Sequence, residues 1–329
     1  MIVSELTERE LVSRVQQHLP PPPPWLTVGI GDDAAVAEPM RNRLEVLTAD
    51  TVVDGVHFDR RFCAPDAIGH RALAVNLSDL AAMGAEPRLA LLSFALPSSL
   101  PVADFDGILS GFGALAAAHR LTLAGGNLTR TPGPLAIDVT ALGTVKRRGV
   151  MLRSGARPGD IVYVSGSVGA ATAGLDMLRE SASDPDQVCV TRYLRPEPRV
   201  RTGLLLGRNR AASACIDLSD GLADGITRIA EASGVGMVID ADAIPIDPGA
   251  RTWFEHRQQD PLTTALASDD YELLFTVRPR MRGRLRAAIQ HGGVPLTRIG
   301  VCTPDRMISV RTPDGRELSP LPHGFSHFR

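Results

Sequence analysis

The sequence predicts an α/β protein of two domains, on three observations. The chain has 329 residues, enough for two domains or for one unusually large one. From Val28 onward, short apolar runs alternate with stretches of helical periodicity, which is typical of sheets packed with helices. A segment rich in Arg and Gly interrupts this alternation at residues 146–160, after which it resumes. We therefore expect one domain over residues 1–150 and a second over residues 151–329.

The first domain is predicted to open with a helix, because apolar residues recur at roughly helical spacing within Glu5–His18. The five consecutive prolines Pro20–Pro24 cannot continue a helix, so we expect a stiff surface spacer there. The other elements expected in this domain are strands at Leu44–Thr48, Leu89–Leu96 and Ala136–Val145, and helices at Asp66–Met83 and Phe105–His119.

The second domain is predicted to begin with a strand at Ile161–Val164. Another apolar strand leads to Asp217, and a helix follows Asp220. The remaining expected elements are strands at Met237–Ile239 and Glu272–Val277, a helix at Met281–His291 and a final strand near Arg298–Cys302.

Composition excludes several classes of protein. No apolar segment is long enough to span a membrane and no secretory leader is visible, so we expect a cytoplasmic protein without a membrane partner. The formal net charge is −2 and the basic residues are spread along the chain, which argues against a nucleic-acid partner. The four cysteines lie far apart, so we expect free, mostly buried thiols and no zinc site.

Lysine usage restricts how this chain could hold a nucleoside triphosphate. Lys146 is the only lysine, and no Gly-Lys-Ser/Thr run of the P-loop type is present. If the protein binds a triphosphate, its positive partners must be metal ions, arginine side chains and backbone N–H groups.

Carboxylates stand at positions that secondary structure alone does not favour. Asp33 lies among small residues, and Asp79 lies inside an otherwise apolar helix, with Asn76 one turn earlier on the same face. A lone Asp33 or Asp220 would most often be a turn or N-cap residue. A carboxylate such as Asp79 is costly inside an apolar helix unless it is paired or binds metal. Together with acids that end or follow strands, namely Asp50, Asp217 and Asp220, these residues favour a magnesium site.

Seven motifs, in order from about residue 28 to the end, resemble those of the thiamine-monophosphate kinase family. Its superfamily also holds aminoimidazole-ribonucleotide synthetase, selenophosphate synthetase and a hydrogenase-maturation protein. The last two are disfavoured, because no cysteine precedes Cys63 and the chain does not end in a cysteine. The motifs are Gly29–Asp33, Asp50–Phe58, Asn76–Ala85, Arg153–Gly155, Ile216–Gly221, Asp270–Leu273 and Gly324–Phe328.

The resemblance implies a two-domain fold like that of aminoimidazole-ribonucleotide synthetase and direct phosphoryl transfer from ATP to thiamine monophosphate. It also implies a homodimer whose N-terminal domain binds ATP and metal, while the C-terminal domain completes the nucleotide and substrate site. By position, the implied nucleotide contacts are Gly126, Arg153 and Ser219, and the implied substrate contacts are His57, Asp269 and Phe325. The implied Mg²⁺ ligands are Asp33, Thr48, Asp50, Asp79, Asn127, Asp217 and Asp220, of which Asp33, Asp79 and Asp217 are expected to be catalytic.

Two departures from the family pattern keep other functions open. Asn127 stands where the family has an aspartate ligand, and Asp269 stands where it has a glutamate flanked by glycines. The first change affects metal binding, and the second affects acceptor recognition. The alternatives are a paralogous kinase or ATP-dependent synthetase with another small acceptor, and a non-catalytic nucleotide-binding homologue.

Two further segments are given structural interpretations. The turn Gly166–Gly169 before a helix could cradle phosphate, but a strand-to-helix turn is the favoured interpretation. Five arginines within residues 278–286 are expected to form a solvated face.

Overall fold

The computed structural model describes residues 1–312, 314–315 and 317–322. The chain divides into two compact units, which are described separately. Unit 1 holds Met1–Leu80 and Glu86–Val145, and unit 2 holds Ala81–Ala85 and Lys146–Arg329. Within the described part of the chain, no helix combines the length and apolarity needed to cross a bilayer.

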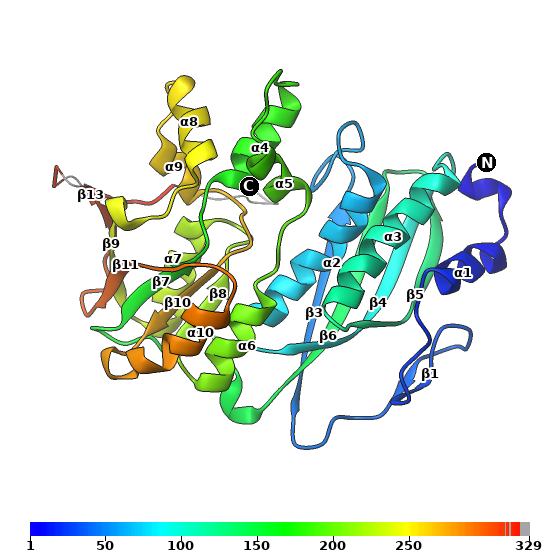
Figure 1. Cartoon of the computed structure of the whole chain (residues 1–329), viewed down its shortest axis with the longest axis horizontal. Coiled ribbons are helices and arrows are strands. Elements are labelled where there is room, and N and C mark those ends of the chain that lie inside the picture. The colour runs from blue at the N-terminus through cyan, green and yellow to red at the C-terminus, as the bar shows by residue number, and fades with distance from the viewer. Residues whose placement is uncertain (313, 316, 323–329) are drawn as a thin grey trace. The chain divides into compact units, whose positions relative to one another are not determined.

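Unit 1 is built around a four-stranded sheet in the order β3-β6-β4-β5 (Figure 1). Strand β6 pairs antiparallel with β3 and β4, whereas β5 runs parallel to β4. Its elements are α1 (Glu8–Gln17), β1 (Leu26–Val28), β2 (Val36–Ala37), β3 (Leu44–Val53), α2 (Pro65–Ala82), β4 (Glu86–Pro97), α3 (Val102–Ala118), β5 (Thr122–Thr131) and β6 (Ala136–Val145), preceded by the 3-10 helix η1 (Val3–Glu5).

Helices α2 and α3 cover one face of this sheet (Figure 1). The two helices can approach closely because each has a glycine at the contact. A Cβ at Gly69 or Gly111 would overlap the backbone of the other helix. Phe94 of β4 packs edge to face against Phe105 of α3, with ring centroids 5.3 Å apart. We call the opposite side of the sheet the open face, because Leu47 there is 66% exposed.

Among its described residues, unit 2 holds a seven-stranded sheet in the order β13-β12-β9-β11-β7-β10-β8. All neighbouring strands are antiparallel except β12 and β9. The strands are β7 (Ile161–Ser165), β8 (Ala214–Asp217), β9 (Gly236–Asp240), β10 (Leu273–Val277), β11 (Leu296–Thr303), β12 (Ile308–Arg311) and β13 (Glu317–Leu318). The helices are α4 (Ala170–Arg179), α5 (Gln187–Leu194), α6 (Val200–Asn209), α7 (Leu222–Ser233), α8 (Pro248–His256), α9 (Pro261–Leu266) and α10 (Arg286–His291), with 3-10 turns η2 (Arg147–Gly149), η3 (Ala241–Ala243) and η4 (Pro279–Leu285).

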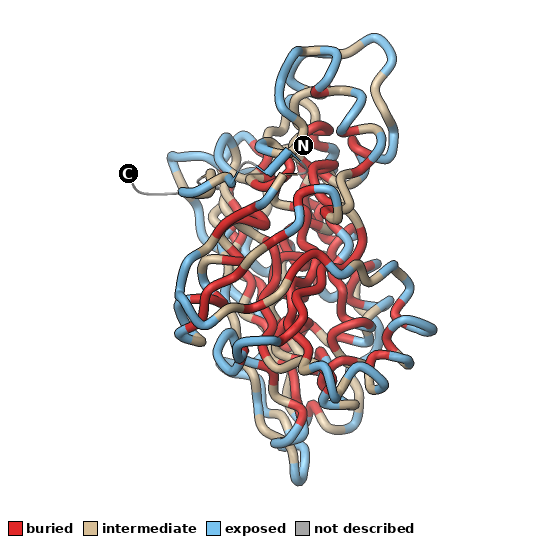
Figure 2. The backbone as a smooth tube through the Cα atoms, turned by 90° about the vertical axis from the view of Figure 1, so that its left-hand side faces the viewer, coloured by how far each residue is buried: buried red, intermediate tan, exposed pale blue. Residues whose placement is uncertain are grey.

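Two apolar clusters stabilise unit 2. The larger one joins sheet residues such as Val164 and Ile216 to Ile226 and Ile229 of α7. The smaller one packs Met177 of α4 against Cys189 of α5 and Phe254 of α8. Figure 2 shows the buried residues following the strands and helices, with the exposed ones mainly in the connecting loops. Cys63, Cys189, Cys215 and Cys302 are all buried and free, as expected.

The predicted α/β class with mixed sheets is confirmed, while several element predictions need correction. The helix predicted at Met281–His291 is instead η4 followed by the short α10, because a proline opens the segment and a glycine interrupts it. The strand predicted as final near Arg298–Cys302 is β11, which β12 and β13 follow. Helix α4 is the helix expected after the turn Gly166–Gly169, whereas strand β5 and helices α5, α6, α8 and α9 were not predicted.

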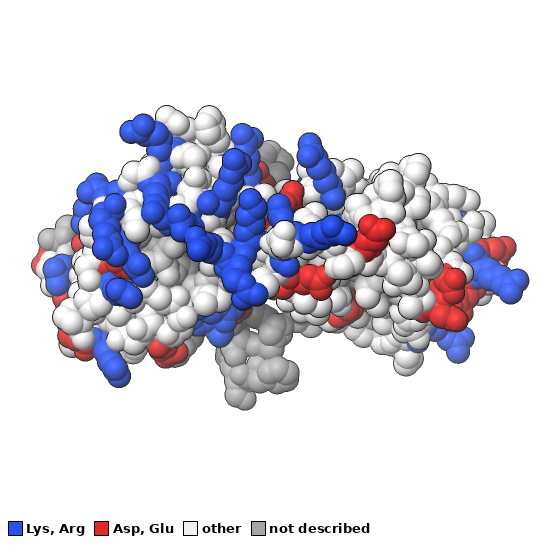
Figure 3. Space-filling model, turned by 90° about the horizontal axis from the view of Figure 1, so that it is seen from below, with Lys and Arg blue, Asp and Glu red and all other residues white. Residues whose placement is uncertain are grey.

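Basic side chains gather on the part of the surface seen in Figure 3, although they are spread along the sequence. Within the five-arginine stretch, Arg280, Arg282 and Arg286 are exposed, which fits the expected solvated face. The absence of a nucleic-acid partner stays a prediction.

Candidate active site

In unit 1, the predicted metal ligands of β3 and α2 lie together. Thr48 on β3 donates a hydrogen bond from its hydroxyl to the Asp79 carboxylate on α2. Because alternate residues of a strand share a face, Asp50 lies on the same side of β3 as Thr48. All three side chains are partly exposed, so a ligand can reach them.

Asn76 lies one turn before Asp79 on α2 and is fully buried. Its side-chain N–H donates to the Ala72 carbonyl at 3.2 Å, but its Oδ1 has no hydrogen-bond partner within the residues that the structure describes. A buried amide oxygen without a partner is costly and calls for a functional explanation. An acceptor oxygen beside a carboxylate and a hydroxyl is the donor chemistry that a hard cation or its bound water prefers.

Asp33 stands in an exposed turn of unit 1. Gly31 takes a left-handed φ of +125°, and the Asp33 N–H donates to Asp32 Oδ1 at 2.9 Å. Gln16 of α1 ties this turn down by donating to the Ile30 carbonyl at 3.0 Å. The turn therefore presents both aspartates to solvent rather than burying either as a helix cap.

Gly126 and Asn127 lie in the middle of β5. A Cβ at Gly126 would stand 1.8 Å from the Leu92 carbonyl oxygen, so only glycine fits beside β4 there. Asn127 pairs with Ser93, which pairs with Asp138 of β6, which in turn pairs with Thr51 of β3. Thr51 lies on the opposite face of β3 from Thr48 and Asp50. The row of paired residues that ends at Thr51 therefore lies on the open face. Within unit 1, Asn127 therefore does not join Thr48, Asp50 and Asp79.

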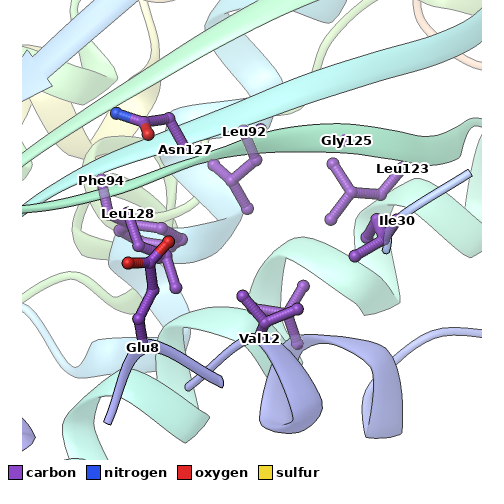
Figure 4. A pocket seen from close by; sticks show the side chains of 11 residues that line it. Glu8, Val12, Ile30, Leu92, Phe94, Leu123, Gly125, Asn127 and Leu128 are labelled. Carbon is purple, nitrogen blue, oxygen red and sulfur yellow. The ribbon is translucent and has the colours of Figure 1, made fainter. Parts of the chain in front are cut away.

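Figure 4 shows the Asn127 side chain on the other side of β5 from Val12 and Ile30. Those two residues line an open pocket of roughly 500 Å³ between β4, β5 and α1, and Asn127 is also among the residues that line it. Its wall is mostly apolar, with Glu8 as the charged residue. This pocket is chemically distinct from the acidic group around Asp79.

His57 lies in the loop after β3 and is half-buried. Its Nδ1 accepts a hydrogen bond from the Val53 backbone N–H at 3.1 Å. An Nδ1 that accepts leaves the proton of the neutral ring on Nε2. His57 can therefore donate a hydrogen bond from Nε2, which suits a phosphate or hydroxyl oxygen.

In unit 2, the predicted residues gather at one edge of the sheet. Asp217 ends β8 and pairs with Leu273, the first residue of the antiparallel strand β10. Ser219 and Asp220 follow β8, and Asp269 precedes β10, so all of them lie beyond the same ends of two neighbouring strands. Asp217 is buried, whereas the other three are partly exposed.

Arg153 lies beside the free edge of β8. The carbonyl of Leu152 accepts a hydrogen bond from Cys215 of β8 at 2.8 Å, and the Arg153 carbonyl accepts from Ser233 of α7 at 3.3 Å. These backbone contacts fix the main chain and leave the Arg153 side chain exposed. An exposed guanidinium at a sheet edge suits an anionic ligand.

Asp270 and Glu272 are two buried carboxylates that sequence reasoning did not single out, although they lie in the quoted motif Asp270–Leu273. Burial raises the pKa of Asp270 to about 7. The hydrogen bonds from the backbone N–H groups of Ala171 and Gly169 act in the opposite direction and lower this pKa. Glu272 accepts from Arg199 Nε at 2.7 Å and from Ser165 at 2.6 Å.

The turn Gly166–Gly169 has the structural role that we favoured for it. The N–H groups of Gly169 and Ala171, at the start of α4, donate to the Asp270 carboxylate at 2.6 and 2.9 Å. A side chain of the protein thus occupies the position at this helix N-terminus that a phosphate would need.

Within the described residues, no three His, Cys, Asp or Glu side chains converge as a metal cage. Phe325, predicted as an aromatic wall for the substrate, lies outside the described residues.

Both halves of the chain match a known family. Residues 31–145 match AIR synthase related protein, N-terminal domain, and residues 157–312 match AIR synthase related protein, C-terminal domain. Thiamine-monophosphate kinase of Escherichia coli (strain K12) is 38% identical over 307 residues, which cover 92% of this chain and 92% of that protein. These matches confirm the predicted family resemblance and the two-domain fold that it implied.

Solved structures agree with the sequence matches. Thiamine-monophosphate kinase from Stenotrophomonas maltophilia K279a has a TM-score of 0.83 at 38% identity, covering 95% of this chain and 98% of that chain. AaThiL complexed with AMPPCP and TMP has a TM-score of 0.77 at 30% identity, covering 100% of this chain and 99% of that chain.

Proposed function

The chain belongs to the thiamine-monophosphate kinase family, and we propose that it phosphorylates thiamine monophosphate to thiamine diphosphate with ATP. The observation that carries this proposal is the likeness over the whole chain to a relative complexed with AMPPCP and TMP. AMPPCP is an analogue of ATP, the phosphoryl donor of the proposed reaction, and TMP corresponds to its acceptor. The phosphoryl group passes directly from donor to acceptor, so the protein's task is positioning and charge neutralisation.

Magnesium is the proposed metal, held by Asp33, Asp50 and Asp79 with Thr48 in unit 1 and by Asp217 and Asp220 in unit 2. A site without a cage of three acids fits this ion, because Mg²⁺ usually takes one or two carboxylates together with substrate phosphates. The buried, partnerless Oδ1 of Asn76 adds an acceptor atom beside Asp79. When bound, magnesium supplies positive charge to the transferring phosphoryl group, in a chain that has no P-loop lysine for this purpose.

The remaining residues bind and orient the two substrates in this proposal. The Gly126 backbone, the Arg153 guanidinium and the Ser219 hydroxyl contact the nucleotide. His57 donates from Nε2 to an acceptor oxygen, which its Nδ1 contact with Val53 supports. Asp269 binds the acceptor's cationic part, and we keep Asp33, Asp79 and Asp217 as the catalytic carboxylates.

We also propose a homodimer formed through the open face of unit 1. Leu47 is 66% exposed and Leu91 is 39% exposed on this face. A sheet face with large apolar side chains in water is typical of a protein–protein contact. Light scattering should give twice the 35.1 kDa chain mass at micromolar concentration, and a monomeric mass would contradict the proposal.

Product formation tests the proposed function. Purified protein with ATP, magnesium and thiamine monophosphate should yield thiamine diphosphate and ADP, and EDTA should stop the reaction. ATP consumption without thiamine diphosphate would favour the paralogue with another acceptor. ATP binding with no turnover on any phosphorylated acceptor would favour the non-catalytic homologue.

A further inference from the structure

Asp269 is flanked by polar side chains that point into the protein. Ser268, Asp270 and Glu272 are all buried, whereas Asp269 is partly exposed. Buried polar side chains are retained where each has hydrogen-bond partners. The partners of these three residues show what holds the backbone of Asp269 in place.

Both neighbours of Asp269 bind the start of helix α4. Asp270 accepts from the Gly169 N–H at 2.6 Å and from the Ala171 N–H at 2.9 Å. Ser268 accepts from the Thr172 N–H at 3.2 Å. Three N–H groups that a helix cannot satisfy internally are thus bound by the two residues on either side of Asp269. The backbone of Asp269 is held from both sides against α4.

The next residue fastens the same segment to β8. Tyr271 takes a left-handed φ of +54°, which is uncommon for a bulky residue and persists only where its surroundings enforce it. Its N–H donates to the Leu218 carbonyl at 3.1 Å, and the Leu218 N–H donates to the Glu272 carbonyl at 2.8 Å. Leu218 lies between Asp217 and Ser219, so the segment is fixed to the residues proposed to bind metal and nucleotide.

We propose that Asp270 is a positioning residue for the acceptor, which holds Asp269 at a fixed place relative to Ser219 and Asp220. The proposal rests on the proposed function, because it takes Asp269 as the acceptor contact. An aspartate is required because both of its oxygens accept hydrogen bonds from backbone N–H groups. An asparagine would place an NH₂ donor against one of them.

Steady-state kinetics of the full chain carrying Asp270→Asn test the proposal. We expect the KM for thiamine monophosphate to rise about tenfold, which is the loss expected for one misplaced contact, with kcat and the KM for ATP within about threefold of wild type. Ser268→Ala, which removes the hydrogen bond to the Thr172 N–H and the side-chain hydrogen bond to Asp270 but keeps the Asp270 carboxylate, should change the same KM in the same direction by less. It serves as the second variant where Asp270→Asn does not fold.

Asp160→Asn is the matched control. Asp160 is equally buried and lies just before β7, where it accepts from Ser213 at 2.6 Å and from the Arg157 N–H at 3.1 Å. The Asp160→Asn variant should be less stable than wild type, with an unchanged KM for thiamine monophosphate. Equal KM changes in Asp160→Asn and Asp270→Asn would overturn the positioning role, because they would reflect general loosening of unit 2.

Amide hydrogen exchange gives a readout that needs no substrate. Exchange at Tyr271 and Leu218 should be faster in Asp270→Asn than in wild type and in Asp160→Asn. Unchanged exchange at these amides overturns the proposal. If wild type makes no thiamine diphosphate, the proposed function fails, and exchange alone then decides whether Asp270 anchors this segment.

Discussion

In unit 1 the Asp79 carboxylate is partly exposed and accepts a hydrogen bond from the neutral Thr48 hydroxyl. In unit 2 the Glu272 carboxylate is fully buried and lies within 2.7 Å of Arg199 Nε and 3.2 Å of Arg192 Nη1. The first carboxylate is partly exposed, so a ligand can reach it. The second uses up both oxygens inside the protein, so it can only support other residues.

This difference separates two kinds of acid that the same family motifs contain. The accessible Asp79 is expected to affect turnover far more than stability, and the buried, arginine-paired Glu272 stability more than turnover. A carboxylate already paired with arginine has little left for a metal, whereas one beside a hydroxyl keeps its charge available. Three substitutions, taken from the largest expected effect to the smallest, can break or sharpen this comparison.

Glu272→Gln should have the largest effect, a loss of about 3–5 kcal/mol in the free energy of unfolding. The substitution leaves the Arg199 guanidinium, which is 3% exposed, buried beside a neutral amide. Urea denaturation of the two proteins measures the loss. Arg199 also lies 2.7 Å from the exposed Glu197, which compensates part of it.

The control for Glu272→Gln is Glu317→Gln. Glu317 pairs with Arg311 at 3.1 Å on the surface, where both side chains are about half exposed. Surface pairs are worth roughly 0–1 kcal/mol, so this variant should unfold close to wild type. Similar losses in both variants would mean that the buried pair has no special role in unit 2.

Sequence periodicity predicted those elements whose pattern is local. β6 occupies the predicted residues Ala136–Val145, and α2 begins and ends within one residue of the predicted Asp66–Met83. Strand β5 was missed because Gly125 and Gly126 have low strand propensity. The reason for Gly126 is its close approach to Leu92 of the parallel neighbour β4, a long-range contact that no local pattern contains.

The site was predictable as a set of residues but not as a geometry. The family resemblance marked Asp79 and Asn127 alike as metal ligands, yet the two face opposite sides of the sheet. The cause is a β-bulge between β4 and β5. Ala90 of β4 pairs with Leu123 and Leu91 pairs with Gly125, so Ala124 of β5 has no partner residue on β4. Without the bulge, Asn127 would share the face of Leu123, which is covered by helices, because a one-residue slip exchanges the two faces.

Asp79→Asn should lower turnover about 100- to 1,000-fold, the usual cost of removing one charged group from a preorganised site. The amide still accepts the Thr48 hydrogen bond, so the unfolding temperature should stay close to that of wild type. The kinetics of thiamine diphosphate formation, read beside thermal unfolding, check both parts.

A suitable control for Asp79→Asn is Asp106→Asn on α3. Asp106 is similarly half-buried and pairs with Arg14 at 2.6 Å, but no motif marks it. Loss of the Asp106 charge should leave turnover within about twofold of wild type, since such partly exposed ion pairs contribute little to stability. Near-normal turnover in Asp79→Asn would remove the central carboxylate from the proposed mechanism.

Asn127→Asp has the smallest expected effect, because Asn127 lies on the open face, away from Thr48 and Asp79. If a magnesium ion binds on that face, we expect a gain of at most about tenfold in magnesium affinity, with turnover equal to or above that of wild type. A carboxylate adds a unit charge where the family has its acid, and a tenfold change corresponds to about 1.4 kcal/mol after desolvation is subtracted. Calorimetric titration of magnesium in the presence of AMPPCP measures the affinity.

Thr129→Asp separates direct ligation from general attraction at this site. Thr129 is exposed in the single chain and lies two residues along β5, on the same open face as Asn127. Because we propose this face as the dimer contact, light scattering should first show that Thr129→Asp and Asn127→Asp have the same mass as wild type. A negative charge there should attract magnesium over distance but not bind it, so its effect should be smaller and should vanish at high salt. Equal gains in both variants would show that charge alone is responsible and that Asn127 never contacts the metal. Tighter binding only in Asn127→Asp, with slower turnover, would instead mean that this chain has adapted its site to a neutral ligand.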